Sequence, residues 1–132
     1  MQPALFYVNG IVEGGFGLRV CMNPKRPLPG IPSEELHDSG VFYAQIFGPV
    51  FTAAAYASIL MAKKRDSGTK QLFGAMWMVY HLTNVIRGIS AVRKGKKQLP
   101  GSAWGFHMMM SLWFAYYLKK SSFDLRELLP FK

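Results

Sequence analysis

Two ionisable side chains, Glu13 and His81, lie inside otherwise apolar stretches and are the best candidates in this sequence for acid–base chemistry. Ionisable residues in such stretches are costly to bury and usually face a bundle interior or a cavity. Each lies near the middle of its stretch, and the two stretches are expected to run in the same direction. We therefore predict a hydrogen bond or ion pair between Glu13 and His81. The pair either satisfies itself in an apolar core or acts on a ligand or a proton.

Further polar side chains accompany this pair at helical spacing. Asn9 lies four residues before Glu13 and Asn84 three residues after His81, so each is expected on the same helix face as its neighbour. A second polar layer is predicted near the far ends of these stretches, formed by Arg19, Gln45, Arg87 and His107. The two arginines either hold a phosphate or carboxylate in a bidentate manner or extend to lipid headgroups. All six residues are candidate ligand-binding positions.

The histidines do not predict a haem or a metal. Folding the third and fourth stretches about a turn near Lys97 sets His107 opposite Arg87, offset from His81 by about six residues, or roughly 9 Å along a helix axis. A tetrahedral metal site needs three or four suitably spaced ligands, and the spacing indicates none. The single cysteine, Cys21, excludes an intrachain disulfide and a cysteine-rich zinc module. We therefore expect no metal and no cofactor.

The elements that position these residues are marked by gaps between clusters of charge. The chain of 132 residues is 50% hydrophobic and 17% charged, which excludes a disordered chain, and its formal net charge is +9. No charged residue lies between Ser39 and Ala62. A bilayer core of about 30 Å needs about 20 apolar residues as helix. Residues 101–118 form a similar stretch, residues 71–92 are interrupted by His81 and Arg87, and the first stretch contains Glu13 and Arg19.

The sequence therefore predicts an all-α protein, a four-helix transmembrane bundle that forms one integral membrane domain over residues 1–132. Helices are expected over about 4–22, 40–62, 72–92 and 102–118. Gly10, Gly14 and Gly17 are expected to allow close helix packing. The loop after the first helix is rich in proline, and the tail after the fourth is amphipathic and is expected to lie along the membrane interface.

Basic residues flank the predicted spans and set the expected orientation. With four spans, eight of these residues fall on the side of the two termini and six on the other. The eight are Lys63, Lys64, Arg65, Lys70, Lys119, Lys120, Arg126 and Lys132, and the six are Lys25, Arg26, Arg93, Lys94, Lys96 and Lys97. The excess favours both termini on the cytoplasmic or matrix side. Anionic lipid headgroups, rather than nucleic acid, are the expected partners of these runs. The sequence does not name the organelle.

The order of these pieces is similar to that of a known family. The segment GLRVCMNPKRPLPGIP, the helix YAQIFGPVFTAAAYASILMA, a third helix with a histidine and a short fourth helix resemble the small DoxX-like four-helix membrane proteins. The resemblance covers most of the chain at the level of topology. Gln45 stands where such proteins have an arginine early in the second helix. The resemblance implies the four-helix fold, and some relatives are associated with quinone-linked redox systems.

Two functions are compatible with this sequence, and whether the chain is an enzyme stays open. Small size, short basic loops and no recognisable catalytic motif favour a non-catalytic accessory or scaffold subunit of a membrane complex. The alternative is a small membrane enzyme or binder for an apolar ligand with a polar head, such as a quinone, sterol or polyketide. There, Glu13 and His81 would do acid–base work, and Arg19 and Arg87 would hold the head. A transporter is less favoured because no inverted repeat is evident.

Overall fold

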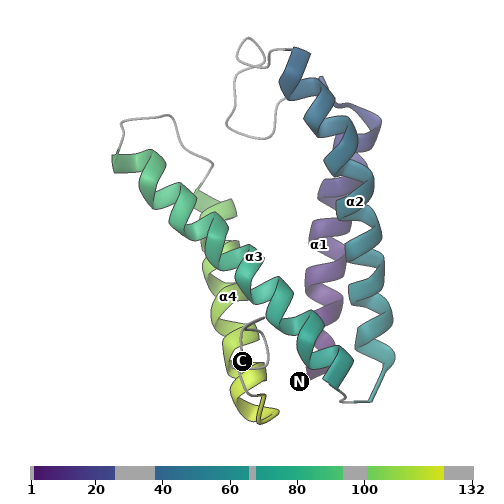
Figure 1. Cartoon of the computed structure of the whole chain (residues 1–132), viewed down its shortest axis with the longest axis vertical. Coiled ribbons are helices and arrows are strands. Elements are labelled where there is room, and N and C mark those ends of the chain that lie inside the picture. The colour runs from purple at the N-terminus through teal and green to yellow at the C-terminus, as the bar shows by residue number, and fades with distance from the viewer. Residues whose placement is uncertain (1, 26–37, 66–67, 94–100, 124–132) are drawn as a thin grey trace, which may run out of the picture.

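The protein is built from α-helices. The computed structural model describes residues 2–25, 38–65, 68–93 and 101–123. Within these residues there are four helices and no strand, namely α1 (Gln2–Met22), α2 (Asp38–Lys63), α3 (Gly68–Arg93) and α4 (Gly101–Lys120) (Figure 1). The prediction of an all-α protein with four helices is confirmed, with ends that differ by a few residues. Most of the predicted proline-rich loop and most of the predicted amphipathic tail lie outside the described residues.

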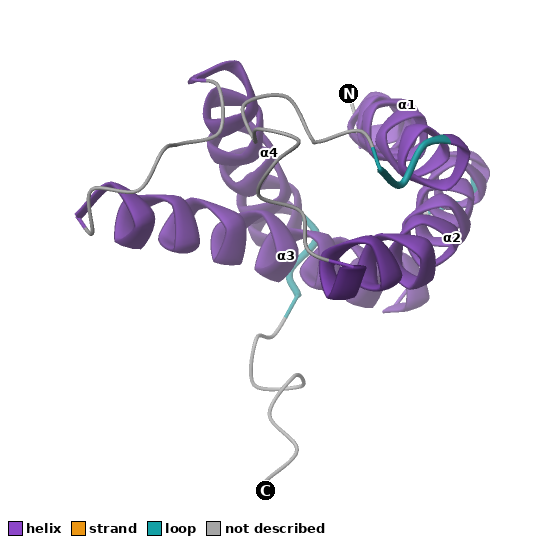
Figure 2. Ribbon diagram, turned by 90° about the horizontal axis from the view of Figure 1, so that it is seen from above, coloured by secondary structure: helices purple, strands orange, loops and turns teal. Residues whose placement is uncertain are grey.

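The helices form two hairpins. α1 packs mainly on α2, and α3 packs mainly on α4. Figure 1 shows the hairpins converging at the end where α1 begins and α4 ends, and diverging at the end where α2 begins and α3 ends. In Figure 2, which looks down on the molecule from above, α4 lies on the opposite side from α1 and α2, and α3 runs between them.

Glycines allow the close approach of α1 and α2. A Cβ atom added to Gly17 would lie 2.9 Å from the backbone nitrogen of Thr52, and one added to Gly10 would lie 2.8 Å from the backbone oxygen of Ala55. Real Cβ atoms do not come so close to backbone atoms. These two positions therefore need glycine if the helices are to keep their present separation, which confirms the packing predicted from the glycine spacing.

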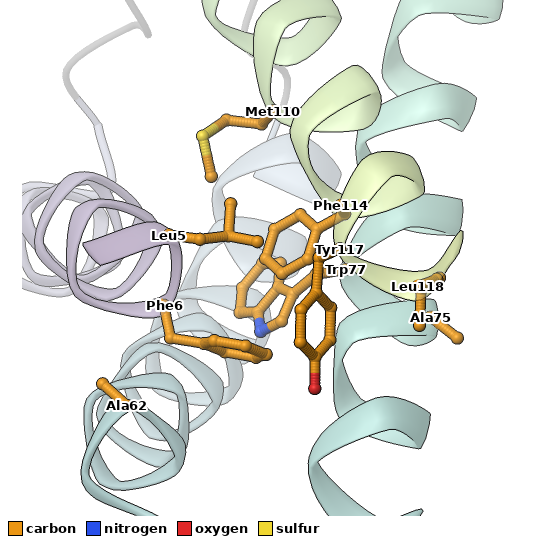
Figure 3. Close-up of a cluster of buried hydrophobic side chains, with 9 residues drawn as sticks. All are labelled: Leu5, Phe6, Ala62, Ala75, Trp77, Met110, Phe114, Tyr117 and Leu118. Atoms are coloured by element: carbon orange, nitrogen blue, oxygen red, sulfur yellow. The ribbon is translucent and has the colours of Figure 1, made fainter. Parts of the chain in front are cut away.

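Aromatic side chains join the hairpins where they converge. Phe6 of α1 is fully buried, and its ring meets the rings of Phe114 and Tyr117 of α4 edge-on, at centroid distances of 5.5 and 5.4 Å. Edge-on pairs of this kind are favoured by the charge distribution of aromatic rings. Figure 3 shows Leu5, Trp77 and Met110 gathered around them. This cluster holds α1 against α3 and α4.

The outer surface of the helices is apolar. Large hydrophobic side chains are exposed on every helix, including Ile11, Leu18, Phe47, Tyr56, Leu82, Ile86, Met109 and Leu112. The interior, by contrast, contains the buried polar residues Asn9, Glu13, Ser58, His81 and Ser111. By length and composition, one segment of the described helices, Gly40–Lys63, is apolar enough to cross a membrane. This segment corresponds to one of the four predicted spans, so the transmembrane bundle stays a prediction.

Candidate functional site

A cluster of polar side chains lies where α1, α3 and α4 come together. Glu13 comes from α1, His81 from α3 and His107 from α4. His81 is fully buried, Glu13 is 3% exposed and His107 is half-buried. We call these three residues the polar cluster. Burying polar groups is costly unless they are hydrogen-bonded, so their partners need to be identified.

The imidazole of His81 is the centre of this cluster. Its Nδ1 atom lies 2.8 Å from Nδ1 of His107 and 3.8 Å from Oε1 of Glu13. Its Nε2 atom lies 2.7 Å from Oδ1 of Asn9, which is buried one helical turn before Glu13 on α1. The ring of His81 therefore connects α3 to both α1 and α4.

The Asn9 contact determines which nitrogen of His81 carries hydrogen. A carbonyl oxygen such as Oδ1 can only accept a hydrogen bond, so Nε2 of His81 is the donor. In a neutral imidazole the other nitrogen, Nδ1, then has a free lone pair. Nδ1 of His107 is the donor in the short contact between the two histidines. The lone pair of His81 Nδ1 thus faces into the cluster, towards both His107 and Glu13.

The two oxygens of the Glu13 carboxylate have different neighbours. Its Oε2 atom accepts a hydrogen bond of 3.2 Å from the hydroxyl of Tyr80, while Oε1 faces Nδ1 of His81. Tyr80 lies next to His81 on α3, and Asn84, one turn later, donates through Nδ2 to the backbone oxygen of Tyr80. Oε2 of Glu13 is therefore held by Tyr80, and Oε1 is left facing His81.

Aromatic rings fix the orientation of His81. The indole of Trp77, one turn earlier on α3, lies nearly parallel to the imidazole at a centroid distance of 5.8 Å. The ring of Phe114 of α4 lies nearly parallel to it at 6.0 Å. These contacts leave the imidazole little freedom to rotate, so its two nitrogens keep their directions towards Asn9 and the cluster.

The structure brings together four of the predicted site residues. Glu13 and His81 lie at the same depth, as their positions in parallel helices predicted, and Asn9 contacts His81 as well as sharing a face with Glu13. His107 also belongs to this group. Asn84 is adjacent, but its amide is bonded within α3. The catalytic and ligand-binding roles assigned to these residues stay predictions.

The predicted offset of His107 from His81 is wrong. Gly88 contacts Trp104 and Gly74 contacts Tyr117, so the level of α4 that faces His81 lies near residues 110–111. A side chain in a helix pair inserts between residues one turn apart on the facing helix. His81 accordingly reaches His107 on one side and Phe114 on the other. The expectation of no haem rested on that offset, whereas the expectation of no metal rested on the spacing of the ligands in the sequence.

The members of the predicted second layer differ in their surroundings. Arg19, Gln45 and Arg87 are exposed on their helices, and within the described residues none of them bonds to the polar cluster. His107, predicted to lie with them, contacts His81 instead. The anion-binding role of the two arginines stays a prediction.

Tyr80 was not among the site residues predicted from the sequence. Adjacent residues of a helix point about 100° apart, so a tyrosine next to His81 was not expected on the same side. Its long ring nevertheless reaches Glu13, and the spacing of Tyr80 and Asn84 at four residues was the signal available. Tyr80 also lines an open apolar groove of about 160 Å³ between α2 and α3, with Val50, Phe51, Ala54, Phe73, Met76 and Trp77.

This arrangement has two chemical capacities. The carboxylate oxygen of Glu13 and a ring nitrogen of each histidine all lie within 4.8 Å of one another. Such a group can share a proton among three sites, or it can offer three donor atoms to a metal ion. Asn9 and Tyr80 bond to the outer atoms of this group and would hold it in place in either case.

Comparisons with protein-family models, with curated proteins and with solved structures find no match to this chain. The resemblance to the DoxX-like proteins therefore stays a prediction.

Proposed function

We propose that this chain is a small multi-pass membrane protein whose four helices cross the bilayer. The main observation in support is that the helices expose apolar side chains and bury polar ones. Ile11 and Leu112 are 65% and 68% exposed, whereas Glu13 and His81 are 3% and 0% exposed. Soluble monomers rarely expose contiguous apolar surface on this scale, and lipid is the solvent that favours it.

The positions of charge at the helix ends support the same proposal. Lys63 ends α2 and is followed by Lys64 and Arg65, and Lys119 and Lys120 end α4 at the same end of the molecule (Figure 1). The ammonium group of Lys120 lies 5.7 Å from the ring centroid of Tyr116. Aromatic and basic side chains in this arrangement are typical of a membrane–water boundary, where anionic headgroups would be their partners.

Within the membrane we propose a non-catalytic accessory or scaffold role. The buried polar groups of the cluster bond to one another and to Asn9 and Tyr80, as expected of an interior that holds helices together. The outer faces of all four helices, by contrast, present apolar side chains that are free to contact other membrane subunits. A chain of 14.9 kDa with this distribution is suited to packing beside larger partners.

A second function is favoured by one observation. Tyr80 lines the groove between α2 and α3 and also donates to Glu13. An apolar ligand lying in this groove could place a polar head near Tyr80 and thereby reach the cluster. The protein would then bind a quinone-, sterol- or polyketide-like molecule, with Glu13 and His81 acting on its head.

Photo-crosslinking in native membranes separates the two functions. A photoreactive amino acid is placed at the exposed positions Phe47, Leu82 and Leu112, with the buried position Ser58 as the control. The scaffold role predicts a discrete protein adduct from at least one outer position and none from Ser58. Lipid adducts alone from all outer positions would contradict it. A small molecule that is extracted from wild type and lost in Glu13→Gln would establish the second function.

A further inference from the structure

We propose that Glu13, His81 and His107 bind one divalent transition-metal ion of the zinc type. This inference rests on the geometry of the polar cluster and is independent of the proposed scaffold role. The three residues belong to three different helices, α1, α3 and α4. A metal bound here would therefore join the two hairpins through coordinate bonds, near the aromatic contacts of Phe6.

The donor atoms suit such an ion. Two imidazole nitrogens and one carboxylate oxygen, all within 4.8 Å of one another, form a set that zinc and its neighbours in the first transition row accept. Mg²⁺ and Ca²⁺ prefer oxygen ligands and more of them. A site with three protein ligands also leaves a position for water or another molecule.

The surrounding contacts match those of a metal site. Metal-bound histidines almost always donate their other ring nitrogen to an oxygen, and ligating carboxylates are themselves hydrogen-bonded. Nε2 of His81 bonds to Oδ1 of Asn9 at 2.7 Å, which leaves Nδ1 free to ligate. Oε2 of Glu13 accepts from Tyr80 at 3.2 Å, which leaves Oε1 directed at His81. Two of the three ligands are thus held with their donor atoms facing inwards.

A small adjustment would complete the site. Zinc–nitrogen bonds of about 2.0–2.1 Å in a tetrahedral arrangement place two ligating nitrogens about 3.3 Å apart. The two Nδ1 atoms now lie 2.8 Å apart, joined by a hydrogen bond. Binding would replace that hydrogen with the metal, and His107 would carry its ring hydrogen on Nε2. His107 is half-buried, whereas Glu13 and His81 are buried, so His107 is the ligand expected to make this adjustment.

A bound cation would also offset the cost of burying Glu13. A buried carboxylate is costly unless it is paired or coordinates a metal. Within the described residues, the polar groups nearest this carboxylate are the hydroxyl of Tyr80, which donates to it, and Nδ1 of His81, whose lone pair faces it. Neither is a permanent cation, so a divalent ion is the partner whose charge fits this position.

Zinc titration of the purified full chain in detergent tests the proposal. The protein is treated with a chelator and desalted, and Zn²⁺ binding is measured by calorimetry, with Mg²⁺ as the comparison ion. We expect one Zn²⁺ per chain, a higher melting temperature with zinc and no response to Mg²⁺. Glu13→Gln and His107→Gln should each weaken zinc binding more than about 100-fold, since even outer-shell partners are worth 10- to 100-fold.

The third histidine of the sequence, His37, supplies the matched control. His37→Gln should keep wild-type affinity. A loss of affinity in His107→Gln but not in His37→Gln shows that binding needs the histidine of the polar cluster. The proposal is overturned if wild type binds no zinc or if Glu13→Gln and His107→Gln bind like His37→Gln. Should these two variants fail to fold, electron paramagnetic resonance of Cu²⁺ bound to wild type decides. Coupling to two nitrogens supports the site, and coupling to none or one overturns it.

Discussion

At the scale of single residues, the contacts of His81 determine what the cluster can do. Its Nε2 atom is committed to Asn9, its Nδ1 atom faces Glu13 and His107, and Trp77 and Phe114 hold the ring plane. The ring is therefore oriented before any ligand arrives. Preorganisation of this kind lowers the cost of binding because no rotamer has to be selected.

The Asn9 contact gives a prediction about affinity. Asn9→Leu keeps the size of the side chain and removes the acceptor for Nε2 of His81, so zinc affinity should fall by about 10- to 100-fold. Asn23→Leu is the matched control because Asn23 is exposed directly after α1, ten residues from Glu13. Competition with a coloured chelator measures both variants. Equal affinities for the two variants would contradict the role given to Asn9.

At the scale of helices, the packing of α1 on α2 depends on single glycines. A Cβ at Gly17 would meet the backbone nitrogen and the hydroxyl of Thr52, whereas a Cβ at Gly15 would meet nothing within 4 Å. The two glycines lie two residues apart on the same helix. They therefore separate the effect of packing from that of helix propensity.

We expect Gly17→Ala to lower the free energy of unfolding by about 1–3 kcal/mol, because α1 and α2 must move apart. Gly15→Ala should leave it unchanged or raise it by up to about 1 kcal/mol, because alanine favours helix over glycine. Thermal unfolding in detergent, followed by circular dichroism, measures both. A loss of stability in Gly15→Ala equal to that in Gly17→Ala would contradict this account of the interface.

The sequence predicted the helices better than their register. Charge clusters mark the helix ends, so the bounds of α1 to α4 were expected to within a few residues. The depth of Glu13 relative to His81 followed from helix direction alone. The level of His107 did not, because it depends on where Gly74 meets Tyr117 and Gly88 meets Trp104. In helices that are apolar on all sides, hydrophobic periodicity does not specify such contacts.

At the scale of the whole molecule, the distribution of polar and apolar side chains is the property that the proposals share. The cluster lies inside, the hydrophobic side chains of four helices face outwards, and basic residues follow α2 and end α4. Among the described residues, composition alone identifies one segment that could span a membrane, Gly40–Lys63. The number of crossings is therefore the decisive property to measure.

Labelling of single cysteines in sealed vesicles with an impermeant maleimide measures it directly. In a Cys21→Ser background, which removes the single native cysteine, a cysteine is placed at Ser33, Lys64, Lys96 or Ser121. Four crossings predict that Ser33→Cys and Lys96→Cys react from one side and that Lys64→Cys and Ser121→Cys react from the other. Reaction of Lys96→Cys from the same side as Lys64→Cys, or of all four from one side, would contradict the four-span account.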